Sequence, residues 1–180
     1  MENLKKYNFY SGPAILPQEV FQQAGKAVVE LDNIGMSLIE ISHRSKEFQA
    51  IIDEAKMLVR ELMNLNDEYQ ILFLAGGASM QFCQIPMNML NENESAAYMD
   101  VGSWSKKAIK EGKLFGKVDI VASSADKNYS YMPKNFSIPD SAKYFHITTN
   151  ETIHGVQMQT IPDSPIPMIG DMSSDIFSRA

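Results

Sequence analysis

Two glycines, an alanine and a serine follow an apolar run near the middle of the chain, in the order Gly76, Gly77, Ala78, Ser79. Glycine adopts backbone angles that other residues resist, so the chain can turn sharply there. In the helix that we expect next, Ser79 would be the cap, and the N–H groups of Ala78 and Ser79 would face an anion. The stretch fits either a phosphate-binding turn or a plain strand-to-helix turn. It matches neither GxGxxG nor GxxxxGK[ST].

Three further groups follow apolar segments that read as strands: Trp104, Thr152 and Asp171. Taken singly, each has a structural explanation, as a surface-packed aromatic, a turn hydroxyl and a helix cap. Taken with the glycine turn, they form the set that a phosphorylated heteroaromatic cofactor needs. We expect the carboxylate to keep a ring nitrogen protonated, which makes the ring an electron sink, and the indole to stack on that ring.

Apolar strand-like segments alternate with helical patterns along the chain. The predicted strands are Ile71 to Ala75, Ser95 to Val101, Val118 to Ala122, Tyr144 to Thr148, and Met168 to Asp171. The first carries no charge, as expected for a central strand that is covered on both faces. This alternation predicts an α/β fold with a mostly parallel sheet and with the active groups at the carboxyl ends of the strands.

Helix signals lie before and between these strands. The expected helices run from Pro17 to a stop at Gly35, from Ser45 through Leu65, from Met80 through Leu90, and from Ser105 through Phe115. The second of them carries an apolar face. Ser45 is the expected N-cap of the second helix. Pro86 should kink the third near Phe82. We expect the stretches from Asp126 to Pro139 and from Asn150 to Gly155 to be irregular.

Composition limits the class of protein. The chain has 180 residues, enough for one substantial core, and its 22 acidic and 16 basic residues give a net charge of −6. That charge argues against nonspecific nucleic-acid binding. No apolar run approaches the roughly 18 residues of a spanning helix, and no secretory signal is recognisable. The single cysteine, Cys83, excludes an internal disulfide and reads as packing. We expect a cytoplasmic protein that binds no membrane and no nucleic acid.

Six motifs, in this order, resemble the phosphoserine aminotransferases among the fold type I pyridoxal phosphate enzymes. They are NFYSGPAILP (8–17), SHRSKEF (42–48), GGASMQF (76–82), GSWSKKA (102–108), NETIHG (150–155) and DMSSDIFSR (171–179). The resemblance implies a three-layer α/β fold, with an N-terminal arm at residues 1–15 and the first part of the large cofactor-binding domain at 16–180. The small C-terminal domain would be absent from these residues.

The resemblance also implies roles for single residues. The amides after Gly77, those of Ala78 and Ser79, would bind the phosphate of pyridoxal 5'-phosphate, and Trp104 would stack on the pyridine. Thr152 would bond the phenolic side of the cofactor, and Asp171 the pyridine nitrogen. His43 and Arg44 would bind the anionic substrate, because a guanidinium meets a carboxylate or phosphate with two hydrogen bonds.

The implied reaction is amino transfer from L-glutamate to 3-phosphohydroxypyruvate, giving O-phospho-L-serine and 2-oxoglutarate. The implied pathways are the biosynthesis of serine and of pyridoxine. The full-length family forms homodimers. In the family, one lysine binds the cofactor covalently, and the resemblance places it some twenty residues after Asp171. That position lies beyond Ala180, the last residue of this sequence, and no lysine follows Lys143. We therefore expect no catalytic residue within the 180 residues, which alone would be inactive, and no metal site.

Two other functions remain open from the residues alone. One is a noncatalytic phosphate-binding or dimerisation module that keeps the glycine turn without the chemistry. The other is a different reaction on the same cofactor, as in cysteine desulfurases or alanine–glyoxylate transaminases. The SHR and NETIHG motifs favour the phosphoserine aminotransferases over this second alternative.

Overall fold

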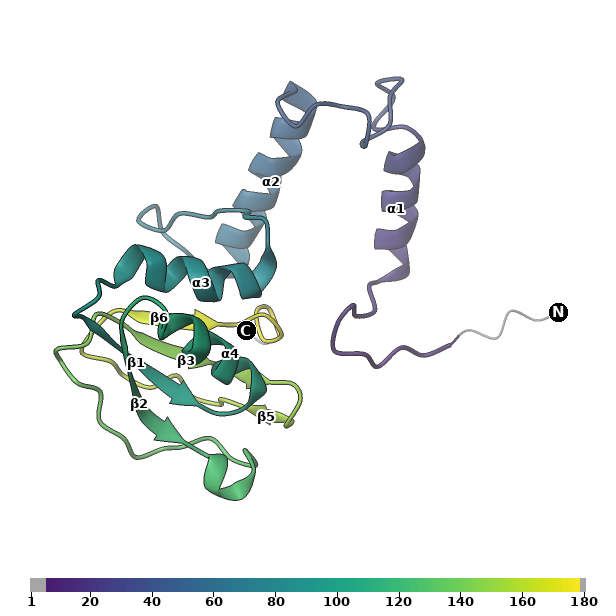
Figure 1. Cartoon of the computed structure of the whole chain (residues 1–180). Coiled ribbons are helices and arrows are strands. Elements are labelled where there is room, and N and C mark those ends of the chain that lie inside the picture. Colours follow the sequence, from purple (N-terminus) through teal and green to yellow (C-terminus); the bar gives the residue numbers. More distant parts are fainter. Residues whose placement is uncertain (1–5, 179–180) are drawn as a thin grey trace. The chain divides into compact units, whose positions relative to one another are not determined.

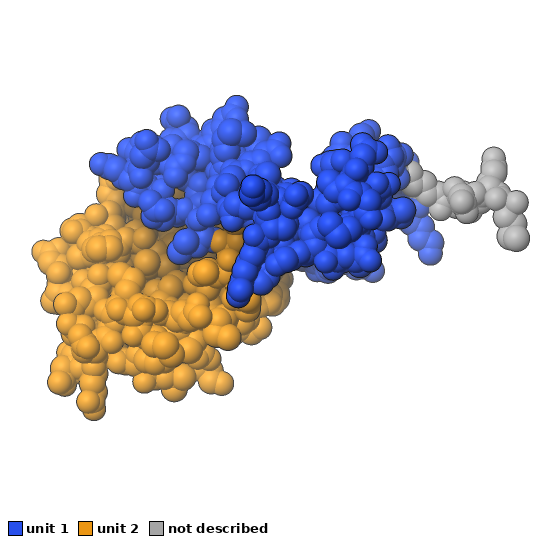
Figure 2. Space-filling view, turned by 90° about the horizontal axis from the view of Figure 1, so that it is seen from above, with its two compact units in different colours: residues 1–72 blue, residues 73–180 orange. Residues whose placement is uncertain are grey.

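The computed structural model describes residues 6–178 and divides the chain into two compact units, residues 1–72 and 73–180 (Figure 2). Across the described residues, no helix combines the length and the apolar character needed to cross a membrane.

Three predictions from the sequence reach beyond the described residues. The arm at residues 1–15 has its first five residues outside them, and its boundary stays a prediction. Arg179, which closes the last motif, and Ala180 also lie outside the described part. The expectation that the covalently bound lysine lies beyond Ala180 therefore stays a prediction too.

The described part of the first unit, from residue 6 onward, contains two helices, α1 (Gln18–Val29) and α2 (Lys46–Leu62). Helix α1 begins directly after Pro17, as predicted, but it ends well before Gly35. Helix α2 begins where the sequence predicts, because the Ser45 hydroxyl accepts the N–H of Phe48 at 3.2 Å. Neither helix buries a side chain fully, so the apolar face predicted for α2 remains partly accessible.

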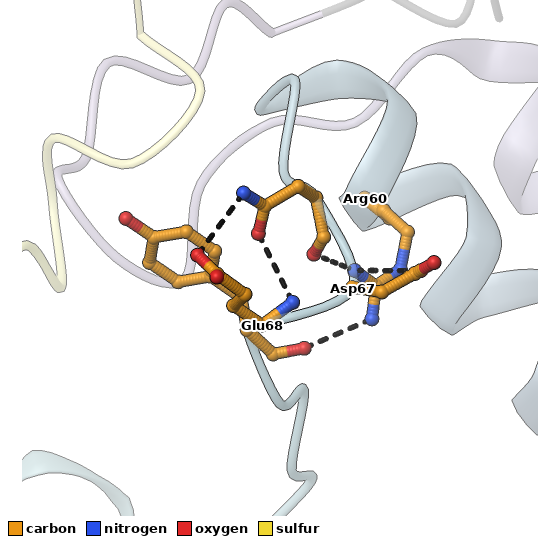
Figure 3. A network of polar contacts seen from close by, with 5 residues as sticks. Arg60, Asp67 and Glu68 are labelled. Carbon is orange, nitrogen blue, oxygen red and sulfur yellow. Dashed lines mark hydrogen bonds and ion pairs between the residues drawn. The ribbon is translucent and has the colours of Figure 1, made fainter.

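The loop after α2 is fixed by one arginine (Figure 3). The Arg60 guanidinium donates to the backbone oxygens of Asn66 and Tyr69, the latter at 2.9 Å, and lies 3.8 Å from the Asp67 carboxylate. Asn66 in turn accepts the Glu68 N–H at 3.0 Å. These contacts fold residues 66–69 back on the last turns of α2.

The second unit is built on a parallel four-stranded sheet in the order β2-β1-β3-β6 (Figure 1). Its strands are β1 (Ser95–Asp100), β2 (Lys117–Ser123), β3 (Phe145–Thr148) and β6 (Met168–Asp171). A short 3-10 helix (Ala125–Lys127) follows β2. The expected α/β class and mostly parallel sheet are confirmed, and the carboxyl ends of all four strands meet at one edge.

Alternation along β1 and β3 divides the core between the two faces of the sheet. On one face, Tyr98 and Tyr144 pack against α3 (Gly77–Met89) and α4 (Ser103–Gly112). On the other face, Met99 and Phe145 pack under irregular segments that follow β2 and precede β6. Among the described residues of this unit, α3 and α4 both cover the first of these faces.

One expected strand is absent, and one expected loop is confirmed only in part. Residues 71–74 form no strand, and Leu72, Phe73 and Leu74 are exposed by 69, 55 and 59%. A strand needs a neighbour to complete its hydrogen bonds, and no strand of residues 6–178 pairs with this run. Within the loop expected at 150–155, residues 152–155 do form a turn, whereas β4 (Asn150–Glu151) pairs antiparallel with β5 (Val156–Gln157).

Candidate functional site

The N-terminus of α3 turns on two glycines with left-handed backbone, Gly76 at φ +91° and Gly77 at φ +59°. A Cβ on Gly76 would lie 2.5 Å from the Cβ of Met80, so only glycine fits there. The helix therefore begins at Gly77, and Ser79 lies inside its first turn. The prediction that Ser79 caps the helix is wrong, because the glycines start the helix earlier than a serine cap would.

This earlier start leaves the first-turn amides of α3 without acceptors inside the helix. Its first backbone bond runs from the Met80 N–H to the Gly76 oxygen at 3.3 Å. The N–H groups of Gly77, Ala78 and Ser79 precede that bond and point out of the helix end. Together with the positive end of the helix dipole, they form a place suited to an anion.

A cavity of about 300 Å³ lies between the start of α3 and the end of β6. Ala78 lines it from the helix, and Asp171 lines it from the strand. The other lining residues are Gln81, Phe82, Ile85, His146, Ile169, Gly170, Met172 and Ser173. The structure thus brings two of the predicted residues to one cavity, Ala78 from the first turn of α3 and Asp171 from the end of β6.

Asp171 is the last residue of β6 and pairs with Thr148 across the sheet. Its Oδ1 accepts hydrogen bonds from Ser173, at 3.1 Å from the backbone N–H and 2.6 Å from the hydroxyl. The Thr149 N–H donates to the Asp171 backbone oxygen at 3.1 Å. The local turn and the strand ladder therefore hold the carboxylate at the cavity.

His146 is a cavity residue that sequence reasoning missed. It lies in the middle of β3, stacked on Tyr98 with 5.0 Å between ring centroids, and Phe82 meets it edge-on at 6.1 Å. Its Nδ1 is buried and has no hydrogen-bond partner among the described residues. Burial lowers the pKa of the imidazole to about 4, against the opposing effect of the Asp171 carboxylate. The signal that the sequence offers for this residue is a histidine within an apolar run that predicts a buried strand.

Trp104 and Thr152 form a second group at the same edge. Trp104 stands in the first turn of α4, and its indole N–H donates to Thr152 Oγ1 at 3.0 Å. The Nζ of Lys107 lies 4.1 Å from the centroid of the Trp104 rings. Glu151, also missed from the sequence, accepts the backbone N–H of Trp104 at 2.9 Å. The predicted pair is thus in direct contact, with an unpredicted carboxylate beside it.

His43 and Arg44 belong to the other compact unit, residues 1–72, where both side chains are exposed. The Arg44 N–H donates to the Ser42 hydroxyl at 3.2 Å, so the turn before α2 orders the backbone of this pair. The exposed Arg44 guanidinium is available to an anionic ligand, with the His43 imidazole beside it. Their assignment to substrate stays a prediction.

A larger cavity, of about 520 Å³, opens on the other face of the sheet. Met99, Phe136 and Met158 line it, and none of the predicted site residues does. Within residues 6–178, no group of three or more histidine, cysteine, aspartate or glutamate side chains is placed to hold a metal ion. The chemistry-bearing residues of this unit gather at the carboxyl edge instead.

Comparison with known proteins gives the same family from sequence and from structure. The model of the class-V aminotransferases matches residues 6–165. The phosphoserine aminotransferase of Bacteroides fragilis is 54% identical over 176 residues, which are 98% of this chain and 49% of that protein. The Flavobacterium psychrophilum phosphoserine aminotransferase is 53% identical over 177 residues, 98% of this chain and 50% of that protein.

Solved structures agree. Phosphoserine aminotransferase from Bacillus circulans subsp. alkalophilus superposes with a TM-score of 0.93 at 46% identity, covering 97% of this chain and 49% of that one. The pyridoxal phosphate-bound enzyme from Trichomonas vaginalis gives 0.85 at 38% identity, covering 93% and 48%. The chain spans about half the length of the curated relatives it matches. With matches of this extent, the chain belongs to the class-V aminotransferase family.

Proposed function

We propose that this chain supplies the cofactor-binding part of a phosphoserine aminotransferase. The reaction is transfer of the amino group of L-glutamate to 3-phosphohydroxypyruvate, which gives O-phospho-L-serine and 2-oxoglutarate. The observation that supports it most is the cavity that Ala78 and Asp171 line together. An anion-binding helix end and a carboxylate on one cavity suit a cofactor that carries a phosphate at one side and a basic nitrogen at the other.

Pyridoxal 5'-phosphate fits this set of groups. The first-turn amides of α3, those of Gly77, Ala78 and Ser79, would bind its phosphate. The Asp171 carboxylate would accept a hydrogen bond from the protonated ring nitrogen and favour its charged form. When bound, the cofactor supplies a cationic ring that withdraws electrons from the carbon carrying the amino group. Residues of this chain bind and orient the ring rather than react with it.

Trp104 and Thr152 would complete the cofactor site from α4 and the β4–β5 turn. Lys107 covers one face of the indole at 4.1 Å, which leaves the opposite face for the pyridine. The Thr152 hydroxyl already accepts the indole N–H at 3.0 Å, and it keeps its own proton to donate to a phenolate oxygen. The Thr152 hydroxyl would thereby orient the Trp104 indole and also donate a hydrogen bond to the cofactor ring on which the indole stacks.

Recognition of the anionic substrates falls to His43 and Arg44 in this proposal. The guanidinium of an arginine pairs with a carboxylate or phosphate through two parallel hydrogen bonds, which a lysine cannot reproduce. Both residues are exposed, so a substrate can reach them. We place the whole enzyme in the cytoplasm as a homodimer, with a role in serine and pyridoxine biosynthesis.

Amino transfer also needs a lysine amine at the cofactor, which we place beyond Ala180 in the whole enzyme. The lysines beside Trp104 have other contacts. Lys106 Nζ lies 4.5 Å from the centroid of the Tyr129 ring, and Lys107 Nζ lies over Trp104. Both side chains, like that of Lys110, are exposed. We therefore propose that the 180 residues alone take up the cofactor weakly and do not catalyse transfer.

The test uses a hybrid enzyme, in which this chain is followed by the part of the Bacteroides fragilis relative that lies beyond the matched region. With pyridoxal phosphate, L-glutamate and 3-phosphohydroxypyruvate, the hybrid should form 2-oxoglutarate and O-phospho-L-serine in equal amounts. The 180-residue chain, assayed in parallel, should form neither, and borohydride treatment should leave no stoichiometric adduct on one lysine. The intact relative is the positive control.

Two outcomes would count against the proposal. A folded hybrid that binds the cofactor but prefers another amino acceptor would contradict the assigned substrate. Turnover of glutamate by the 180 residues alone, with one modified lysine, would show that this part has its own catalytic amine.

A further inference from the structure

Glu151 is a carboxylate buried at the carboxyl edge of the sheet. Its side chain is 0% exposed, and its Oε2 accepts the backbone N–H of Trp104 at 2.9 Å. The other oxygen, Oε1, is buried with no hydrogen-bond partner among the described residues. Leaving one oxygen of a buried carboxylate without a hydrogen-bond partner is unfavourable. Packing alone is therefore a poor explanation for a glutamate here.

The Glu151 carboxylate forms a hydrogen bond with the first turn of α4. In that turn the Ser105 hydroxyl accepts the Gly102 N–H at 2.9 Å, so this amide already has an acceptor on the helix itself. The Trp104 N–H is a first-turn amide with no acceptor within the helix, and Glu151 reaches it from another element, β4. A negative group at this end also interacts favourably with the helix dipole.

The approach of Glu151 to this turn is close enough to require a glycine. A Cβ on Gly102, at φ +152°, would lie 2.4 Å from the Cγ of Glu151 and 2.6 Å from its Oε2. The glutamate side chain therefore lies directly against the residue that precedes α4. Such contact leaves the carboxylate little freedom to move.

Glu151 and Thr152 together hold Trp104 at two points. Glu151 holds its backbone N–H, and Thr152 holds its indole N–H. A hydrogen bond at the indole fixes the direction of the ring, whereas one at the amide fixes the position of the backbone that carries it. With both ends held by neighbouring residues of one hairpin, the plane of the indole is set relative to the end of β3.

We propose that Glu151 is a positioning residue for Trp104, which it holds in place for stacking on the cofactor ring. This role rests on the proposed function only where it concerns the cofactor. The placement of Trp104 by Glu151 is a property of the protein itself and can be measured without any ligand.

Trp104 is the only tryptophan in the sequence, so tryptophan fluorescence of the 180-residue chain reports on it alone. Glu151→Asp keeps the charge but withdraws the carboxylate by one methylene. Glu151→Gln keeps the length and an oxygen acceptor but removes the charge. Glu111→Gln, at the far end of α4, is the matched control for loss of a charge on the adjoining helix.

In the cofactor-free chain, Glu151→Asp should shift the Trp104 emission to longer wavelength, increase its quenching by acrylamide and lower its anisotropy. Glu151→Gln should stay near the wild type, and the control should match it, with unchanged far-ultraviolet circular dichroism in all three. A purely electrostatic role would give the reverse order, with Gln altered and Asp normal. That order, or an Asp variant that is folded and indistinguishable from the wild type, would overturn the proposal.

Titration with pyridoxal phosphate, followed by equilibrium dialysis, addresses the functional consequence. Glu151→Asp should bind the cofactor roughly threefold to tenfold more weakly than the wild type, the range expected for loss of one aromatic stacking contact. Equal cofactor affinity in both proteins, with a displaced Trp104, would overturn the cofactor part of the proposal. Failure of the wild type itself to bind would count against the proposed function and leave the fluorescence result to decide the role of Glu151.

Discussion

The indole N–H of Trp104 donates to Thr152 Oγ1 at 3.0 Å, which joins two residues that are 48 positions apart in the sequence. One stands on the first turn of α4, and the other stands in the turn between β4 and β5. Because the bond fixes the direction of the aromatic plane, the cofactor contacts that we propose for these two residues depend on each other. Changes at either residue should show that dependence.

Trp104→Ala should weaken cofactor binding by the hybrid enzyme roughly threefold to tenfold, because it removes the stacking face but no charge. Equilibrium dialysis with pyridoxal phosphate measures the effect. Trp104→Phe retains an aromatic face without the N–H that Thr152 accepts, so it should recover part of the affinity. Unchanged affinity in Trp104→Ala would mean that the indole points away from the cofactor.

Ser45→Ala should lower the free energy of unfolding of the first unit by about 1 kcal/mol. The substitution removes the hydroxyl that accepts the Phe48 N–H at the start of α2. Urea titration followed by the helical circular dichroism signal measures the loss. Ser11→Ala, at an exposed position outside the helices, is the control and should be neutral. Equal midpoints for the two variants would contradict a capping role.

His146 should make the second unit less stable as the pH falls. Its pKa is lowered from an ordinary value of 6.5 to about 4 in the folded protein, so the unfolded chain binds the proton first. The contribution of His146 to the free energy of unfolding is therefore fully present above pH 6.5. It is lost as the pH falls from 6.5 to 4, by an amount on the order of 3 kcal/mol. Denaturant midpoints at a series of pH values measure this dependence.

The control for this pH effect is another of the three histidines. His146→Phe, which keeps an aromatic ring against Tyr98, should flatten the stability profile between pH 6.5 and 4. His43→Gln removes an exposed imidazole and should leave the profile unchanged. A wild-type profile that is already flat in this range would show that His146 titrates normally.

Much of the parallel sheet could be predicted from the sequence. The apolar runs that became β1, β2, β3 and β6 each lie between turn signals, and alternation with helices implies parallel strands. Ile71 to Ala75 has the same apolar character, yet it forms no strand. The residue types within a segment indicate its tendency to form a strand. A strand also needs a neighbouring strand to pair with, and the segment's own sequence does not show whether that neighbour exists.

The site was predicted unevenly for a similar reason. Ala78, Trp104, Thr152 and Asp171 stand next to glycine turns or strand ends that are visible in the sequence, and the structure brings them together as two groups. Ser79 is not the N-cap that the sequence predicts, because the left-handed Gly76 starts the helix earlier. Glu151 gave no signal, because its role depends on close approach to Gly102 from a distant segment.

The most direct test of this account is the rate of amino transfer by the hybrid enzyme with Asp171→Asn. An amide at the cavity cannot hold the ring nitrogen of the cofactor protonated, so the electron sink is weakened while the shape of the side chain is kept. Asp119→Asn, an exposed change on β2, is the matched control. We expect Asp171→Asn to abolish formation of O-phospho-L-serine with the circular dichroism unchanged and with Asp119→Asn fully active. Near-normal turnover by Asp171→Asn would contradict the assignment of this carboxylate and of the cavity that it lines.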